Sequence, residues 1–429
     1  MKWDKLLRFF LLLVFLVCGC TSKAPQEKKI VIWHWMTDRK DAFGQLASRY
    51  ENETSLKVEF KLFFPPDLYS QKVIAAARAG NLPDVFGILG EKKTFASFVK
   101  AGHIMPLTSY MEKDSGEWKN RFYPQTLDVV IFKNANAYGA EAGIYGVPID
   151  TTVMQFVYNK TLFREAGINP HGYPRTFEDF IKYAQKVKTA LGVDGFVCGW
   201  GEGWLLNALA TEWAINLMGE AKFFQTINGQ IPYTDQEWID VFSFFAQLKK
   251  SDILATNIAT MTNKEAEDAF AKGKAALSFN GTWAVNVYAQ LAPDLEYAFF
   301  SLPRVSGTQP MKIWGGAGSS FMVNSHSSRK DEAVKFLNWL TQKPQQEYLI
   351  EETSNLPAIR GCEESLPSVL QDLLLNFEML THPDTWPRNE DSRVIEVLNR
   401  GLQQIIVGLK GPREVAEEVQ KTKERISRR

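Results

Sequence analysis

The amino-acid sequence predicts an α/β fold, and the pattern of its N-terminal part carries that prediction. Residues 30–33 and 85–88 are short continuous apolar runs, as in strands buried on both faces of a parallel sheet. Between them, residues 41–53 and 67–79 place apolar side chains at helical spacing, and residues 56–64 alternate apolar and polar side chains. The order strand, helix, strand, helix, strand predicts a parallel sheet with right-handed crossovers.

In such a sheet, ligands bind beyond the carboxyl ends of the strands. That rule selects the loops that follow the three predicted strands, at residues 34–38, 64–69 and 89–92. The first of these loops contains Trp35 and Asp38, an aromatic ring and a carboxylate. We therefore expect a ligand site in this part of the chain to include both side chains.

The middle of the chain, residues 143–191, predicts a turn, a strand, a short helix and a long helix. Pro148 interrupts regular structure because its ring fixes φ. Residues 153–158 are rich in β-forming side chains with little polar content, which predicts a largely buried strand. Thr176 begins a stretch with capping-box spacing, and apolar residues at helical spacing follow over residues 177–187.

The alternation of strands and helices continues toward the C-terminus, without an internal repeat or a low-complexity tract. The later elements that we expect are a strand at 194–202, a helix at 204–218, a helix at 264–272, a strand at 275–279 with a turn at 280–283, a linker rich in Gly, Pro and Ser at 302–310, a strand at 321–323, a helix after residue 328, and mainly helix from residue 366 onward.

Three segments carry a resemblance to a known family. Residues 143–191 resemble the pattern Y-G-V-P … Y-N-K … F … E-A-G … P … T-(W/F)-E-(D/E)-F of the extracellular solute-binding proteins of bacterial ABC importers, in the carbohydrate-binding branch that includes maltose-binding protein. Residues 269–285 (AFAKGKAALSFNGTWAV) and residues 315–342 (GGAGSS…NWLTQ) are similar to the same family. The resemblance extends over nearly the whole mature chain.

The resemblance implies a topology that periodicity alone does not give. It implies a two-lobed periplasmic-binding-protein-like fold, in which each lobe is a mostly parallel sheet flanked by helices and the ligand cleft lies between the lobes. The implied division is a signal peptide at 1–19, a lipidated tether at 20–29, a first lobe of 30–147 and 304–354, and a second lobe of 148–303 and 355–429. The expected hinge crossings lie near residues 146–151, 299–304 and 352–358.

The N-terminus predicts an export signal. Basic residues precede a short apolar run at residues 9–17, which is typical of a signal peptide and too short to span a bilayer stably. The run ends at Val17-Cys18-Gly19-Cys20, which resembles the cleavage box of bacterial lipoproteins and implies cleavage after Gly19 and lipidation of Cys20. The alternative is an ordinary signal peptide cut nearby. Residues 21–29 are polar and predict a flexible tether.

Composition argues against several classes of function. The 49 basic and 49 acidic residues balance, so no global field favours nucleic acid. Cys198 and Cys362 remain in the mature chain, and they could pair or stay reduced. The five histidines have no ligand spacing, and we expect neither a metal nor a cofactor. The P-loop, H-E-x-x-H and G-x-S-x-G motifs are all missing.

Aromatic residues give the stronger indication of function. A sugar has apolar C–H faces and a rim of hydroxyls, so proteins bind it with stacked rings and with carboxylates or amides. Tryptophans in predicted loops at strand ends fit this chemistry. Including the polar and glycine positions that accompany them, the predicted ligand-binding residues are Trp35, Asp38, Asp84, Asp150, Thr152, Glu202, Trp204, Trp283, Gly316 and Trp386.

Two of these residues depend on the family resemblance. The residue that aligns with Trp283 commonly packs on the sugar in the family. Asp84 lies in a Pro-Asp-Val element that the family shares, and either a ligand contact or a capped turn would explain it. Gly316, in a glycine-rich loop, either lets the backbone approach a ligand or serves a turn that needs positive φ.

The resemblance implies a binding protein without catalytic activity. It would be monomeric and extracytoplasmic, in the periplasm or at the cell surface, lipid-anchored to a bacterial membrane, and it would pass a mono- or oligosaccharide to the transmembrane subunits of an ABC permease. One alternative is a polyol phosphate such as glycerol phosphate, for which His34, Lys92 and Arg388 are the candidate cations. Others are a glycoside hydrolase using paired carboxylates, and a surface sensor or adhesin.

Overall fold

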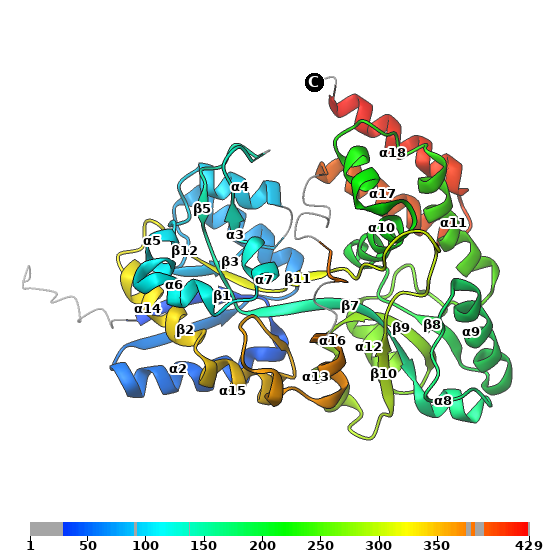
Figure 1. Cartoon of the computed structure of the whole chain (residues 1–429), viewed down its shortest axis with the longest axis horizontal. Coiled ribbons are helices and arrows are strands. Elements are labelled where there is room, and N and C mark those ends of the chain that lie inside the picture. The colour runs from blue at the N-terminus through cyan, green and yellow to red at the C-terminus, as the bar shows by residue number, and fades with distance from the viewer. Residues whose placement is uncertain (1–28, 90–91, 137, 375–378, 382–389, 428–429) are drawn as a thin grey trace, which may run out of the picture.

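The computed structural model describes residues 29–427 except 90–91, 137, 375–378 and 382–389. The predicted signal peptide and the predicted lipidation site at Cys20 lie outside these residues. The described chain forms two lobes, each with its own sheet and helices (Figure 1). Among the described helices, none combines the length and apolar character needed to cross a bilayer.

The first lobe contains a five-stranded sheet in the order β2-β1-β3-β12-β6. Its strands β1, β2 and β3 pair in parallel, which confirms the pattern predicted from the N-terminal sequence, whereas β12 pairs antiparallel with β3 and β6. The strands are β1 (Lys29–His34), β2 (Lys57–Leu62), β3 (Val85–Gly87), β6 (Val147–Pro148) and β12 (Ser320–Val323), with a separate pair β4 (Ile131–Phe132) and β5 (Gly143–Ile144). The helices around them are α2 (Lys40–Thr54), α3 (Pro66–Ala79), α4 (Lys92–Lys100), α5 (Thr108–Met111), α6 (Lys113–Asn120), α7 (Pro124–Asp128), α14 (Lys330–Leu340), α15 (Lys343–Thr353) and α16 (Ser368–Leu374), with short 3-10 turns η1 (Thr37–Arg39) and η2 (Glu363–Ser365).

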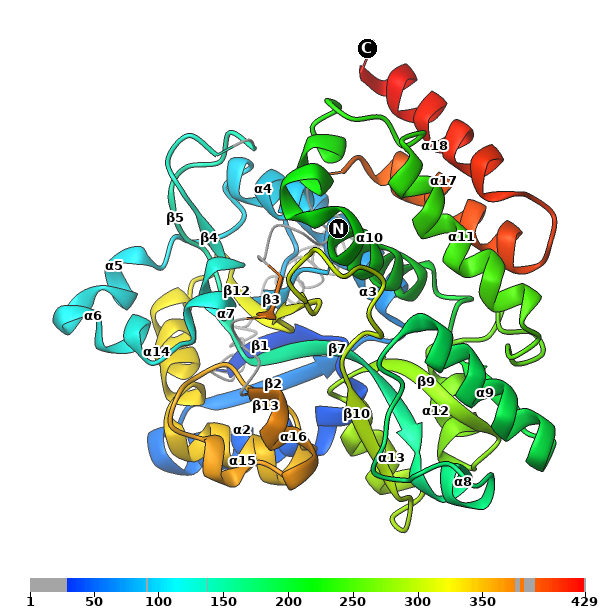
Figure 2. The same cartoon turned by 45° about the vertical axis from the view of Figure 1, so that its right-hand side comes forward.

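The second lobe contains a sheet in the order β10-β7-β9-β8. It is mixed rather than mostly parallel, because β7 runs opposite to both β9 and β10 and only β8 and β9 are parallel. Its elements are β7 (Asp150–Asn159), α8 (Lys160–Glu165), α9 (Phe177–Leu191), β8 (Asp194–Val197), α10 (Gly203–Ile227), α11 (Gln236–Lys250), α12 (Asn263–Ala271), β9 (Ala275–Gly281), α13 (Ala284–Leu291), β10 (Tyr297–Phe300), α17 (Ser392–Ile406) and α18 (Pro412–Ser427). The C-terminal helices α17 and α18 pack on α10 and α11 (Figure 2).

Strand β7 belongs to both lobes. Its second half pairs with β9 and β10 in the second lobe. Its first half pairs instead with two short strands, β11 (Gly315–Ala317) and β13 (Leu356–Pro357), which bring Gly316 opposite Thr152 and Leu356 opposite Thr151. Figure 1 shows β7 running from one body of the protein into the other. The junction between the lobes is therefore a small sheet built around the start of this strand.

Two separate hydrophobic cores assign the rest of the chain to the lobes. Residues of the 302–310 linker region stay with the second lobe, because Leu302 packs in its core and the Arg304 backbone N–H donates to Arg175 O over 2.8 Å. The chain therefore returns to the first lobe through β11, after the position expected near 299–304. Leu356, Leu370, Leu380 and other described residues between them contribute to the first core, and residues 394–419 to the second. The last crossing from the first lobe to the second therefore lies after residue 380, and not at the expected 352–358. The first lobe likewise extends beyond its expected end at residue 354.

Cys198 and Cys362, the two cysteines among the described residues, are both free and buried. Cys198 lies in the second core and Cys362 in the first, so they cannot form the disulfide that the sequence left open. Burial raises the pKa of the Cys362 thiol to about 11. Neither thiol is therefore a reactive group at neutral pH.

A buried ion-pair network fastens β7 to the first lobe. The guanidinium of Arg39, which is only 5% exposed, pairs with Asp150 at the start of β7. The same guanidinium donates to Asp38 Oδ2 over 3.3 Å, and Asn355 Nδ2 donates to that oxygen over 3.0 Å. Asp150 also accepts from the Ser319 backbone N–H. The arrangement joins η1, the start of β7, the turn between β11 and β12, and the residue before β13 at one point.

Replacing Arg39 with methionine should destabilise the protein strongly. The substitution keeps the length of the side chain but leaves the Asp150 carboxylate buried without its cation, and breaking a buried pair in this way costs about 3–5 kcal/mol. Urea unfolding measures the loss. Arg164→Met is the matched control, because it removes a surface pair with Glu296 and should leave the unfolding midpoint unchanged. Equal midpoints for the two variants would contradict the role given to Arg39.

Candidate functional site

A closed ring of five side chains lies where three elements of the second lobe begin or end. The Trp204 indole N–H donates to Glu202 Oε2 over 3.0 Å, and Glu202 Oε1 accepts from the Asn263 backbone N–H over 2.8 Å. Asn263 Nδ2 donates to Glu267 Oε1 over 2.8 Å, and the Trp283 indole N–H donates to the same oxygen over 3.0 Å. The ring closes through the two indoles, whose centroids are 5.8 Å apart. We call these five residues the indole–carboxylate ring.

Local sequence explains how the two indoles are placed. Glu202 is the N-cap residue of α10 and Trp204 lies in its first turn, so the helix start carries both groups. Trp283 follows β9 after a glycine that its ring covers. A Cβ atom built on Gly281 would lie 1.9 Å from Cζ3 of Trp283, which is closer than any real contact. Only glycine at position 281 lets the indole fold back over the strand end.

The first lobe places a third tryptophan in the same way. Trp35 follows β1 and packs over Gly87, where a Cβ would lie 2.3 Å from Cζ3 of the indole. Its ring lies 5.2 Å from that of Tyr69. The buried Tyr69 hydroxyl donates to Trp33 O over 3.0 Å and accepts from the Gly87 backbone N–H over 2.9 Å. These contacts hold Trp35 at the carboxyl end of the parallel strands, in the loop that was predicted from the sequence.

The indole–carboxylate ring of the second lobe and the residues around Trp35 in the first lobe approach each other near the first half of β7. Gly281 pairs with Met154 on β7, which brings the end of β9 to the junction. Asn286 Nδ2, on α13 of the second lobe, donates to Asp38 O of the first lobe over 3.4 Å. A Cβ on Gly318 would lie 2.1 Å from Thr152 Oγ1 and 2.5 Å from Asp150 Oδ1, so this glycine lets β11 approach β7. Gly316, opposite Thr152, has φ at 153°.

Eight of the ten predicted ligand-binding residues thus fall into two groups. The structure brings Glu202, Trp204 and Trp283 into contact in the second lobe. The junction and its first-lobe side hold Trp35, Asp38, Asp150, Thr152 and Gly316. Trp386 lies outside the described residues.

Asp84 lies away from the other predicted residues. It precedes β3, at the amino end of the parallel strands, whereas Trp35 and Asp38 follow the carboxyl end of β1. Both of its carboxylate oxygens serve the fold, since Oδ2 accepts from the Val31 backbone N–H over 2.8 Å and Oδ1 from the Ser327 hydroxyl over 2.5 Å. The structure therefore supports the alternative that Asp84 is a structural residue that fixes a turn.

Sequence reasoning missed three charged residues near these groups. Arg39 directly follows Asp38, and an adjacent cation was the available signal for it. Glu267 lies 16 positions before Trp283, with no motif linking the two. Glu212, on α10, is fully buried, and among the described residues neither carboxyl oxygen has a well-formed hydrogen bond, although the backbone of Trp314 lies beside it. No motif in the α10 sequence marks Glu212 in advance.

Burial controls the protonation of these carboxyl groups. It raises the pKa of Glu212 well above its usual range, and the backbone of Trp314 nearby offsets only part of that effect. Burial also raises the pKa of Glu267, against the lowering effect of its three amide and indole donors. In the first lobe, burial and then the charge of Arg39 lower the pKa of His34 to about 4, so this imidazole is neutral at pH 7.

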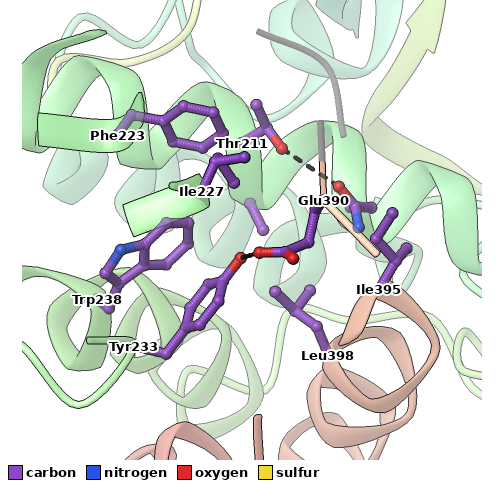
Figure 3. A pocket seen from close by; sticks show the side chains of 10 residues that line it. Thr211, Phe223, Ile227, Tyr233, Trp238, Glu390, Ile395 and Leu398 are labelled. Atoms are coloured by element: carbon purple, nitrogen blue, oxygen red, sulfur yellow. Dashed lines mark hydrogen bonds between the residues drawn. The ribbon is translucent and has the colours of Figure 1, made fainter. Parts of the chain in front are cut away.

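An enclosed cavity lies elsewhere in the second lobe, between α10, α11 and α17. Figure 3 shows Tyr233 and Glu390 pointing toward each other across it, with Trp238, Phe223 and Leu398 around them. The Tyr233 hydroxyl donates to Glu390 Oε2 over 2.8 Å. The cavity measures about 20 Å³, which is room for one water molecule and far too little for a sugar. It is therefore a packing feature of the lobe.

Comparison with known proteins agrees with the fold. The sequence matches the family model of bacterial extracellular solute-binding proteins over residues 35–347. It is 25% identical over 395 residues to the multiple sugar-binding protein of Streptococcus mutans, which covers 87% of each chain. It is 21% identical over 362 residues to the sn-glycerol-3-phosphate-binding periplasmic protein UgpB of Rhizobium meliloti, covering 81% of this chain and 79% of that protein.

Solved structures show the same architecture. A chitin oligosaccharide binding protein superposes with a TM-score of 0.78 at 24% identity, covering 93% of this chain and 99% of that one. Maltose-bound MalE3 of T. maritima superposes with a TM-score of 0.76 at 18% identity, with the same coverage. At these identities the two structures establish the two-lobed fold alone.

Alanine at position 281 should displace the Trp283 indole. The added methyl group cannot coexist with the ring in its present place, and overpacking of this kind costs about 1–3 kcal/mol. We expect a lower unfolding midpoint and a changed tryptophan emission spectrum. Gly44→Ala is the matched control, because nothing lies within 4 Å of its Cβ position in α2. A Gly281→Ala variant with the spectrum and stability of Gly44→Ala would contradict this geometry.

Stability should depend on pH through Glu212. Because its pKa is raised in the folded protein, Glu212 contributes stability that is fully present below the unfolded-state value of 4.5 and is lost as pH rises through the folded value. Glutamine at this position does not titrate. Urea unfolding of the wild type and Glu212→Gln at pH 5 and pH 8 should therefore show the wild type losing stability relative to the variant at the higher pH. A difference that stays constant with pH would rule this out.

Proposed function

The chain belongs to the bacterial extracellular solute-binding protein family, and from that premise we propose that it captures a saccharide between its two lobes. The indole–carboxylate ring carries this proposal. Two tryptophans with their N–H groups tied to carboxylates offer fixed aromatic faces, and sugars bind such faces through their C–H groups. Trp35 and the polar residues at the start of β7 would complete the site from the first lobe.

The proposal includes delivery and anchoring. The protein would hand its sugar to the transmembrane subunits of an ABC permease and would act as a monomer. Lipid on Cys20 would hold it at a bacterial membrane, on the extracytoplasmic side. The name of the Streptococcus mutans relative, a multiple sugar-binding protein, supports a sugar as the ligand.

A phosphorylated polyol is the second candidate, and the described cations argue against it. The similarity to the glycerol-3-phosphate-binding protein UgpB is the reason to consider it. A phosphate would need free positive groups. The buried Lys92 ammonium donates to the backbone oxygens of Val129 and Ile131, the latter over 2.8 Å, and His34 is neutral. Arg39 is bound by two carboxylates, and Arg388 lies outside the described residues.

A glycoside hydrolase would need one carboxylic acid and one free carboxylate on either side of a glycosidic bond. Both oxygens of Glu202 accept hydrogen bonds from the protein, and Asp150 is paired with Arg39. These partners favour carboxylates that hold the site in shape. These contacts favour a protein that binds a saccharide without hydrolysing it over a glycoside hydrolase.

A thermal-shift screen tests the function directly. Protein beginning at residue 21 is heated with maltose, raffinose, stachyose, N,N′-diacetylchitobiose and glycerol 3-phosphate. A sugar at about 100 times its Kd should add about 2.7 kcal/mol of stability and raise Tm. Trp283→Ala should abolish the shift. A shift with glycerol 3-phosphate alone would replace the proposal with the second candidate, and hydrolysis of a bound sugar would replace it with an enzyme.

A further inference from the structure

Glu267 is the member of the indole–carboxylate ring that accepts three side-chain hydrogen bonds on one oxygen. It lies in α12 with 6% of its surface exposed. Its Oε1 accepts three hydrogen bonds, from Asn263 Nδ2 over 2.8 Å, from Asn280 Nδ2 over 3.0 Å and from the Trp283 indole over 3.0 Å. Three donors on one oxygen fix the orientation of the whole carboxylate. They leave Oε2 pointing in a defined direction.

The second oxygen of Glu267 is left without a partner. Among the residues that the structure describes, no donor forms a hydrogen bond with Oε2. An ionised carboxylate can accept on both oxygens, and Oε2 of Glu267, unlike the two oxygens of Glu212, is not cut off from solvent. Oε2 of Glu267 can therefore still accept a hydrogen bond from a ligand, and the members of this family bind solutes.

The position of this acceptor relative to Trp283 suggests its purpose. The indole N–H lies in the plane of the ring, so the hydrogen bond to Oε1 puts the Glu267 carboxylate at the edge of the indole. When a sugar ring stacks on an aromatic face, its equatorial hydroxyls project outward near the same edge. A carboxylate oxygen there can accept a strong, charge-assisted hydrogen bond from one of them.

We propose that Glu267 is a ligand-binding residue whose Oε2 accepts a hydrogen bond from a hydroxyl of the saccharide stacked on Trp283. The inference rests on the proposed function and adds a polar contact to its aromatic one. The same side chain would orient the Trp283 indole through Oε1 and accept a hydrogen bond from a sugar hydroxyl through Oε2. Ligands without a hydroxyl at that position would bind more weakly.

Glu267→Gln isolates the second of these roles. The three donors around Oε1 fix the amide with its oxygen toward them, so Trp283 keeps its partner. The amide nitrogen then replaces Oε2 and cannot accept. Asp268→Asn is the matched control, because it removes the same charge one residue later, from a carboxylate that pairs with Lys272 at the helix surface over 2.7 Å.

The measurement is calorimetric titration with whichever of maltose, raffinose, stachyose or N,N′-diacetylchitobiose raises Tm most, and with its monodeoxy analogues. We expect Glu267→Gln to raise Kd by about tenfold and Asp268→Asn to leave it unchanged. One monodeoxy analogue should bind the wild type more weakly than the parent sugar, and this penalty should shrink in Glu267→Gln.

Three results would overturn the inference in distinguishable ways. Unchanged affinity in Glu267→Gln, with binding still lost in Trp283→Ala, would remove Glu267 from the site and keep the proposed function. Equal deoxy penalties in wild type and variant would reduce Glu267 to a positioning residue for Trp283. No binding of any saccharide by the wild type would remove both proposals. If Glu267→Gln does not fold, a crystal structure of the wild-type complex decides, by whether a sugar hydroxyl lies within hydrogen-bonding distance of Oε2.

Discussion

Strand β7 is the constraint on which the rest of the structure depends. A strand offers two edges for pairing, and β7 uses its second half for the sheet of one lobe and its first half for the short strands that join the other. The lobes therefore share a continuous backbone and cannot drift apart. The buried pair of Arg39 and Asp150 fixes where this shared strand begins, since an unpaired charge at that position would be costly. We expect any movement of one lobe against the other to bend the chain around this point.

The second principle of the structure is that carboxylates hold aromatic rings. Glu202 and Glu267 each accept an indole N–H, and Asn263 links the two acids, so neither tryptophan is free to rotate. Such pre-organisation lowers the entropy lost on binding. Gly281 and Gly87 make the same arrangement possible by leaving room for an indole over a strand end in each lobe. Aromatic rings on both sides of the junction fit the proposed saccharide, which has two apolar faces.

The sequence predicted the local elements well and the connections between them poorly. Helical periodicity located α2, α3 and α9, and the continuous apolar runs located β1 and β3, because these signals come from neighbours along the chain. The lobe crossings were displaced, since the Gly- and Pro-rich stretch before β11 has linker composition but packs on the second core. Trp204 and Trp283 were predicted because both lie in predicted loops at strand ends, and Trp283 also because it aligns with a sugar-packing residue of the family. Glu267 and Arg39 were missed because their roles depend on partners that only the fold brings close. Asp84 lies in a sequence element typical of the family, but its carboxylate accepts hydrogen bonds that stabilise the fold.

The central claim is that a sugar closes the two lobes around the start of β7. In protein beginning at residue 21 the remaining native cysteines, Cys198 and Cys362, are buried. Spin labels attached to cysteines introduced at the exposed positions Ser97 on α4 and Arg400 on α17 would therefore report on the lobes alone. Double electron–electron resonance then measures the distance between the lobes. The account predicts a shorter and narrower distance distribution when a saturating, Tm-raising sugar is added. A distribution that is the same with and without such a sugar would contradict closure around the ligand.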